Sequence, residues 1–180
     1  MEHSCGFDNG PGHWCYQPLH IICQTLASAY FEIVNLGFGT LMVIRDAVLK
    51  DEANVVDLWR SCNLIASYND PAADFRLAMA GCNSTLLVAE EGGRISGSVM
   101  VGHDGHRGWL YYVASSPSYR RQGTGRKIVE AGEQWLRDRN ISKVQLMIRP
   151  TNATVVPFYE RLGYENAPRI LMSKWLNPPE

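Results

Sequence analysis

Residues 120–127, Arg-Arg-Gln-Gly-Thr-Gly-Arg-Lys, limit the possible folds of this chain more than any other stretch. Four cationic side chains lie within these eight residues, and Gly123 and Gly125 separate them. An amphipathic helix follows, because five small or apolar residues share one helical stripe: Ile128, Ala131, Gly132, Trp135 and Leu136. A helix N-terminus already carries partial positive charge and unpaired N–H groups, so added cations are unfavourable there unless an anion binds. The pattern therefore predicts a phosphate-binding turn, in which glycine lets the backbone approach the phosphate closely.

The hydrophobic periodicity around this turn predicts one domain of the α/β (α+β) class. Its expected order is β-α-α-β-β-β-α-β-α-β. We expect strands at 42–46, 85–90, 94–103, 107–115, 143–149 and 165–174, and helices at 51–66, 71–80, 123–139 and 154–162.

Two prolines indicate where helices begin. Asp70-Pro71 is typical of an N-cap followed by proline at the first helical position, although Asn69-Asp70 is also a candidate for an acceptor pocket. Pro157 would clash with the helical backbone if Asn152 capped the last helix, whereas Thr154 as the cap places this proline where no N–H is needed. We therefore expect the last helix to begin at 154–155.

Asp104-Gly105 is typical of a two-residue hairpin turn. Such a turn predicts that His103 and His106 pair across the two strands. On the second of these strands, Tyr111 and Tyr112 should point to opposite faces, one into the core and the other into a cleft.

The composition of the 180 residues excludes several classes of protein. No apolar run approaches the ~20 residues that a membrane-spanning helix needs. A net charge of −1 gives no general case for binding nucleic acid. Five scattered cysteines without a C-x-x-C pair favour a reducing cytoplasm over a disulfide framework. We therefore expect a cytoplasmic protein with neither a membrane nor a nucleic acid as partner.

Residues 1–41 contain no Lys or Arg, whereas residues 42–180 contain all 17. A secretory signal is excluded, because a basic n-region is missing and Glu32 interrupts the apolar part. Three interpretations remain: a metal site of His13, Cys15, His20 and Cys23, whose spacing matches no standard zinc pattern; an extra helix at 19–34; and an appended or wrongly started leader. The third is favoured, so we expect a leader at 1–41, a single domain at 42–180 that starts at Met42, and no metal.

Two common phosphate-binding motifs fail on spacing at the 120–127 turn. A P-loop needs Ser or Thr after its lysine, and a Rossmann fingerprint needs Gly or Ala three residues after Gly125, but Ile128 stands at both positions. A third pattern fits. Residues 113–125 resemble the pyrophosphate loop of the GNAT acetyltransferase superfamily, which reads Gln or Arg, two residues, Gly, one residue, then Gly or Ala.

A second block at the right distance resembles the same superfamily. Its pattern is Asn, five residues, Phe-Tyr, three residues, Gly, then Phe or Tyr. The matching residues here are Asn152, Phe158, Tyr159, Gly163 and Tyr164. From Met42 to Trp175, the chain is most similar to the bacterial YpeA-like acetyltransferases, through segments 58–62, 69–71, 104–108, 111–112 and 159–164.

This resemblance implies the GNAT fold, a mixed central sheet flanked by helices. It also implies an N-acetyltransferase in which a primary amine, with a small molecule favoured, attacks the thioester of acetyl-CoA directly. Tyr159 would be catalytic, as the group that protonates the departing thiolate. Backbone groups of one strand would bind the pantetheine arm, and the N–H groups of the turn would bind the pyrophosphate. The residues assigned to acetyl-CoA are Val113, Ser115, Arg120, Arg121, Gly123, Gly125, Arg126 and Asn152. No metal is implied, and a homodimer is left open.

The chain departs from the family pattern at two informative positions. Arg121 stands where a small residue or glycine is usual, which costs about 1 kcal/mol if the position needs a positive φ. Met147 stands where acetylases of protein N-termini carry a glutamate base, so a protein or peptide acceptor is the less favoured alternative. A non-catalytic acyl-CoA-binding regulatory domain is the other alternative. The general base stays open among water, His103, His106 and Tyr111.

Overall fold

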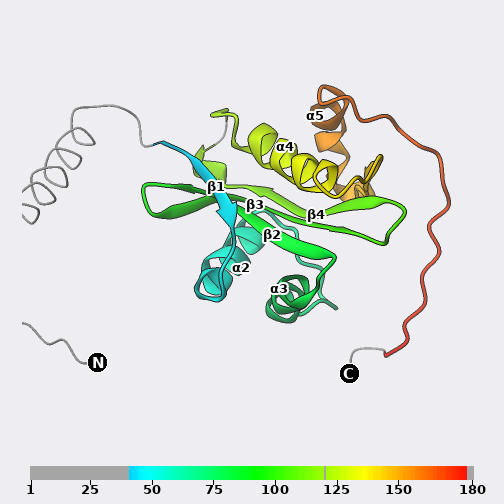
Figure 1. Ribbon diagram of the computed structural model, residues 1–180, viewed down its shortest axis with the longest axis horizontal. Helices are drawn as coiled ribbons and strands as arrows, with labels where there is room; N and C mark the ends of the chain where they lie inside the picture. Colours follow the sequence, from blue (N-terminus) through cyan, green and yellow to red (C-terminus); the bar gives the residue numbers. More distant parts are fainter. Residues whose placement is uncertain (1–40, 120, 178–180) are drawn as a thin grey trace, which may run out of the picture. The chain divides into compact units, whose positions relative to one another are not determined.

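The computed structural model describes residues 41–119 and 121–177. A five-stranded sheet in the order β1-β2-β3-β4-β5 forms its centre (Figure 1). The strands are β1 (Val43–Asp46), β2 (Ser84–Glu91), β3 (Arg94–His103), β4 (Gly108–Ser115) and β5 (Val144–Leu146). Neighbouring strands are antiparallel except for β4 and β5, which are parallel. The expected class, a mixed sheet flanked by helices, is confirmed.

Helices cover both faces of the sheet (Figure 1). They are α2 (Glu52–Ser61), α3 (Pro71–Ala80), α4 (Thr124–Arg137) and α5 (Val156–Glu160), with short 3-10 helices η1 (Leu49–Asp51), η2 (Pro117–Tyr119) and η3 (Pro150–Val155). One buried core lies between the sheet and α2 and α3, and includes Val55, Trp59, Phe75, Leu86 and Val88. The other lies on the α4 side and includes Ala89, Val99, Val101, Ile128 and Val129.

The predicted helix at 51–66 ends five residues early, because Asn63 terminates it. Asn63 adopts a left-handed φ of 55°, and the following N–H of Leu64 donates to the Trp59 carbonyl at 3.0 Å. This arrangement is a Schellman motif, in which asparagine replaces the more usual glycine. Asn140, with φ 59°, ends α4 in the same way.

The two helix starts predicted from proline have different outcomes. The Asp70 carboxylate accepts hydrogen bonds from the N–H groups of Ala72 and Ala73 at 2.9 and 3.1 Å, and α3 begins at Pro71, as expected. Thr154 is not the cap of the last helix. Instead α5 begins at Val156, with Pro157 in its first turn, because a 3-10 helix already occupies the residues before it.

The β3–β4 hairpin has a four-residue loop, so the prediction of a two-residue turn was wrong. His103 pairs with Gly108, and His106 lies in the loop. The Asp104 carboxylate explains the longer loop, since it accepts hydrogen bonds from the N–H groups of His106 and Arg107 at 2.8 and 2.6 Å. These two bonds lower the pKa of Asp104 to about 2.

A β-bulge in β4 overturns the expectation that Tyr111 and Tyr112 face opposite sides. The register with β3 shifts by one residue between Ser98 and Met100, and Tyr112 has a φ of 48°. As a result both rings lie on the side of α2 and α3. Tyr112 stacks on Trp59 with 4.0 Å between ring centroids, while Tyr111 lies beside residues of α3.

The C-terminal part of the sheet is shorter than the sequence predicts. Strand β5 covers only 144–146 of the expected 143–149, and residues 165–174 form no strand. β5 loses its β4 partner after Leu146, and within the described part of the chain no strand covers its other edge. Residues 164–177 run on as an extended segment (Figure 1). A pocket of about 1110 Å³ lies between this segment and the β5 edge, and Met147 and Tyr159 are among its lining residues.

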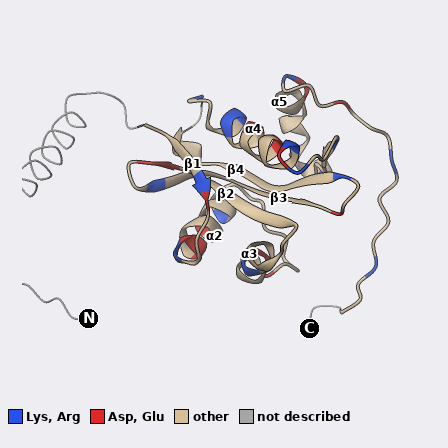
Figure 2. Cartoon of the chain, viewed as in Figure 1, with Lys and Arg blue, Asp and Glu red and all other residues tan. Residues whose placement is uncertain are grey.

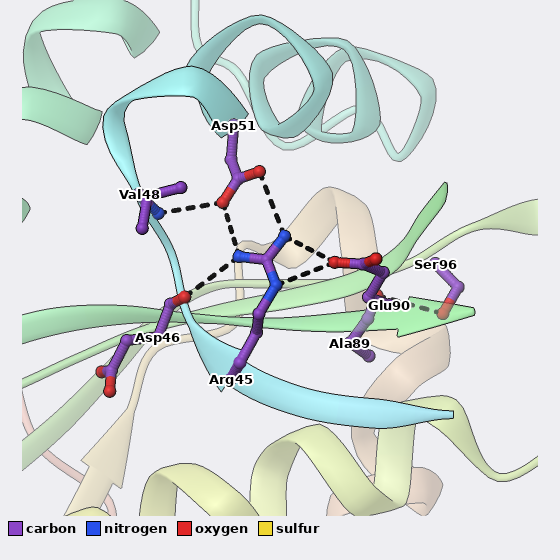
Figure 3. A network of polar contacts seen from close by, with 7 residues as sticks. All are labelled: Arg45, Asp46, Val48, Asp51, Ala89, Glu90 and Ser96. Carbon is purple, nitrogen blue, oxygen red and sulfur yellow. Dashed lines mark hydrogen bonds and ion pairs between the residues drawn. The ribbon is translucent and has the colours of Figure 1, made fainter. Parts of the chain in front are cut away.

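Arg45 links β1 to the rest of the sheet (Figure 3). Its guanidinium donates to both Asp51 oxygens at 2.7 and 3.2 Å, and its Nε donates to Glu90 at 2.8 Å. The Asp51 carboxylate is buried and also accepts a hydrogen bond from the N–H of Val48 at 2.9 Å. The hydrogen bonds from Arg45 hold the pKa of Asp51 below its usual range.

Several expectations concern residues that the structure does not describe. The extra helix, the cysteine–histidine alternative and all of the leader at 1–41 except Leu41 fall within 1–40, and Arg120 is also outside the described ranges. Between residues 41 and 177, position 120 excepted, no helix is long and apolar enough to cross a membrane. In the same ranges, no three His, Cys, Asp or Glu side chains form a metal-binding group.

Candidate active site

The two parallel strands separate in the middle of β4. Pairing between β4 and β5 covers only Gly108–Leu110 and Val144–Leu146. Beyond Leu110, β4 continues for five residues to Ser115 with β3 as its only described strand partner. An extended, amide-containing ligand could therefore pair with this half of β4 as a further strand would.

The bulge lies at the point where the strands separate. The buried hydroxyl of Ser98 donates to the Tyr112 carbonyl at 3.4 Å and accepts a hydrogen bond from the Trp59 indole at 2.9 Å. Val113, the next residue, packs on the opposite side of the sheet, against the α4 core. The bulge thus changes which backbone groups face the opening between β4 and β5.

The turn that follows β4 leads into an uncapped helix start. Gly123 is the N-cap of α4 with φ 82° and ψ 1°, and no side chain in the described part of the chain caps the helix. A Cβ built at Gly123 would have no neighbour within 4 Å among the described residues, so these residues leave the backbone accessible there. The first turn of α4 holds no acidic residue, and the blue at its start in Figure 2 marks Lys and Arg. These features fit a bound pyrophosphate, which would accept hydrogen bonds from the free N–H groups and neutralise the cations.

Arg121 has a φ of 65°, in the left-handed region that favours glycine. We expect Arg121→Gly to raise the free energy of unfolding by up to about 1 kcal/mol, since glycine reaches this φ without a Cβ clash and loses part of the gain to its more flexible unfolded state. Urea denaturation measures the change. Arg121→Ala is the matched control, because it removes the same charge but keeps the Cβ. Equal stability of the two variants would show that the backbone strain is negligible.

Gly125 brings three of the elements together. A Cβ built on Gly125 would lie 3.4 Å from the Phe158 ring and 4.0 Å from the Ser115 Cβ. The first turn of α4, the end of β4 and helix α5 therefore meet at this glycine. A large side chain at position 125 would displace Phe158 from this contact.

Tyr159 follows Phe158 in α5 and is partly buried against the α4 core. Its ring contacts the rings of Phe158 and Tyr164, with centroids 5.0 and 5.6 Å apart. Gly163, with φ 88°, closes α5, and the N–H of Tyr164 donates to the Tyr159 carbonyl at 3.0 Å. Burial raises the pKa of Tyr159 to about 12. Any tyrosine is protonated at neutral pH, and burial keeps this phenol protonated at higher pH as well, so it carries a proton that it could donate.

The remaining predicted site residues are less closely tied together. Asn152 is half-buried in η3 with a non-helical φ of −119°. Arg126 is exposed in the first turn of α4 and contacts Glu130 at 3.4 Å. The structure thus brings Ser115, Gly125 and the Phe158-Tyr159 pair to one place, whereas it shows no contact that joins Asn152 to them.

Asn69, Asp74 and Tyr112 form a hydrogen-bonded network near the opening that the sequence did not predict. The Tyr112 hydroxyl donates to the Asp74 carboxylate at 2.6 Å, and the Asn69 amide donates to the Tyr112 oxygen at 3.0 Å. Burial, with Asp74 second, raises the pKa of Tyr112 to about 12. The only sequence signal for Asp74 is its place one helical turn after the Asp70 cap, which says nothing about Tyr112.

Comparison with known proteins identifies the family to which the chain belongs. The acetyltransferase (GNAT) family model matches residues 53–164. An acetyltransferase of Yersinia pestis (strain Pestoides F) is 38% identical over 135 residues, which cover 75% of this chain and 96% of the relative.

Solved structures share the fold at lower identity. An aminoglycoside N-acetyltransferase in complex with CoA superposes with a TM-score of 0.68 at 17% identity, over 78% of this chain and 99% of the other. A predicted acetyltransferase from Clostridium acetobutylicum, with acetyl-CoA, superposes with a TM-score of 0.61 at 18% identity, over 74% and 96% of the two chains.

Proposed function

The chain belongs to the acetyltransferase (GNAT) family and is an acyltransferase, and we propose that it transfers an acetyl group from acetyl-CoA to a small-molecule primary amine. The observation that carries the proposal is the opening between β4 and β5 beside the uncapped, cationic start of α4. The CoA and acetyl-CoA in the two solved structures support the same donor.

The proposed donor site follows the fold from β4 into α4. Backbone groups of Val113 and Ser115 would bind the pantetheine amides along the open half of β4. The N–H groups of Gly123, Gly125 and Arg126 would bind the pyrophosphate, with charge from Arg121 and, as the sequence predicts, Arg120. Asn152, which follows β5, would hold the pantetheine arm from the other side. Each role is a proposal for mutagenesis to test.

The bound thioester supplies an activated acetyl carbon and a thiolate leaving group. The neutral acceptor amine attacks that carbon, the C–N bond forms, and the C–S bond breaks. Backbone N–H groups near the opening would stabilise the negative oxygen of the tetrahedral intermediate. Tyr159 would give its proton to the departing thiolate and recover one from water, and the amide nitrogen would release its extra proton to water or a nearby base.

Two other functions, a protein or peptide acetyltransferase and a non-catalytic acyl-CoA-binding domain, are less well supported. Met147 is 48% exposed and lines the pocket beside β5, and its thioether cannot act as the base that acetylases of protein N-termini use. A non-catalytic acyl-CoA-binding domain would have no use for the partly buried phenol of Tyr159 in α5.

Thiol release from acetyl-CoA tests the proposed function across small amines and peptides. We expect the purified chain to bind acetyl-CoA and at least one small primary amine to accelerate thiol release. If the chain binds acetyl-CoA but no acceptor accelerates release, the binding-domain alternative is correct. Faster release with peptides than with any small amine would favour a protein acceptor instead.

A further inference from the structure

The Asp74 carboxylate lines a groove on the side of the sheet that α3 covers. This groove has a volume of about 610 Å³, and its walls come from α3, β3 and β4. Asp74 is held by the 2.6 Å hydrogen bond from Tyr112, whose own oxygen accepts from Asn69 at 3.0 Å. Because Tyr112 is the bulge residue where β4 leaves β5, the network connects the groove to the proposed donor site.

The charges around Asp74 leave one carboxylate oxygen available. Tyr112 donates to Oδ2, and among the described residues no side chain donates to Oδ1 and no cation lies within salt-bridge distance. The nearby arginines are engaged elsewhere: Arg76 with Glu52 at 2.7 Å, and Arg149 with the Asn63 carbonyl at 2.8 Å. A cationic ligand could therefore donate to the open oxygen and form an ion pair with the half-buried carboxylate.

The rest of the groove also suits a cation on an apolar chain. Among the residues that the structure describes, no Lys or Arg lines it, whereas a second carboxylate, Asp104, does. Trp109 and Tyr111 present two nearly parallel rings with centroids 6.2 Å apart, and aromatic faces attract ammonium groups. Leu77 and Met100 add apolar wall that could contact methylene groups.

We propose that the acceptor is a primary amine with a second positive charge, and that Asp74 binds this second charge. This inference rests on the proposed function. A carboxylate favours the charged form of a bound amine, whereas the attacking amine must be neutral. Asp74 thus suits an ammonium that stays charged during the reaction, with Tyr112 and Asn69 as positioning residues for the carboxylate.

Steady-state acetylation of 1,4-diaminobutane and 4-aminobutan-1-ol by the full chain tests this proposal, because the two acceptors differ only in the distal group, a charged ammonium in the first and a neutral hydroxyl in the second. We expect Asp74→Asn to lower kcat/KM for the diamine at least about tenfold, as is usual for a lost hydrogen bond between charged groups, and to change the amino alcohol less than about twofold. Asp57→Asn, an exposed carboxylate on α2 that contacts Arg60, is the control and should change neither. An equal loss for both acceptors, or no loss for the diamine, overturns the proposal.

Calorimetry separates this inference from the proposed function. If wild type releases no thiol with any amine, binding of 1,4-diaminobutane to wild type and to Asp74→Asn still reports on the groove. If Asp74→Asn fails to fold, Tyr111→Leu replaces it, since Tyr111 is 41% exposed and contributes an aromatic face. We expect either variant to bind the diamine more weakly than wild type does, and unchanged binding refutes the site.

Discussion

Tyr159→Phe is expected to lower kcat for acetyl transfer by about 100-fold, the lower end of what a lost general acid costs. The phenol is the proposed proton donor to the thiolate, and phenylalanine keeps the ring contacts with Phe158 and Tyr164. Stability and acetyl-CoA affinity should therefore change little. Single-turnover thiol release, with thermal unfolding of both proteins, measures the effect.

Tyr164→Phe is the matched control for this substitution. The Tyr164 hydroxyl donates to Glu133 at 3.0 Å and links the end of α5 to α4, so its loss should lower stability more than the chemical step. The pH dependence gives a second check. Because burial raises the pKa of Tyr159 to about 12, the proton should stay available through pH 10, where an ordinary tyrosine is about half ionised. Unchanged kcat in Tyr159→Phe would remove this residue from the mechanism.

Arg45→Met is expected to lower the free energy of unfolding by about 2–4 kcal/mol at neutral pH. It leaves the buried Asp51 carboxylate without its main partner, and breaking a buried pair costs about 3–5 kcal/mol. Arg45 itself is 31% exposed, so water reduces the loss. Urea denaturation measures the difference. Arg60→Met removes an exposed pair with Asp57 and should cost less than about 0.5 kcal/mol.

The effect of Arg45→Met should depend on pH in a defined direction. The pKa of Asp51 in the folded protein lies below its unfolded value of about 3.9, because Arg45 stabilises the carboxylate. The stability from this pairing is therefore fully present above about pH 4 and is lost as pH falls through the folded pKa. Wild type and variant should converge in stability below that point. A constant difference down to pH 2 would mean that Asp51 is not the cause.

The sequence predicted most of the order of elements because local chemistry determines it. Asp70 and Pro71 are neighbours in the chain, and together they specify the start of α3. The apolar stripe of α4 can likewise be identified from the residues of that helix alone. The glycine turn could likewise be predicted from the sequence, because the positive φ of Gly123 at the start of α4 depends only on neighbouring residues.

The errors arose where distant residues decide the local structure. The Tyr112 carbonyl at the bulge bonds to Ser98 of β3, which in turn bonds to Trp59 of α2. The alternation of residues in β4 alone does not indicate these distant contacts. For the same reason the sequence could not join Asp74 to Tyr112, although both stand in readable elements. The absent strand at 165–174 is a related case. Its apolar residues favour a strand, but Ile170 and Met172 are 92% and 88% exposed, because no described strand pairs with them.

The bulge also adds one residue to β4 without moving the residues that follow it. Before it, Met100 pairs with Tyr111; after it, Ser98 pairs with Ala114, so the bulge contributes one extra residue. Paired residues share a face of the sheet, and Met100 and Ala114 both pack against the core on the α2 and α3 side. Removing Tyr112 would therefore restore a regular ladder and leave the following side chains on their present faces, but the ring that stacks on Trp59 and donates to Asp74 would be lost. Over evolutionary time, a relative could lose this one residue of β4 and keep the fold without the side chain that it adds.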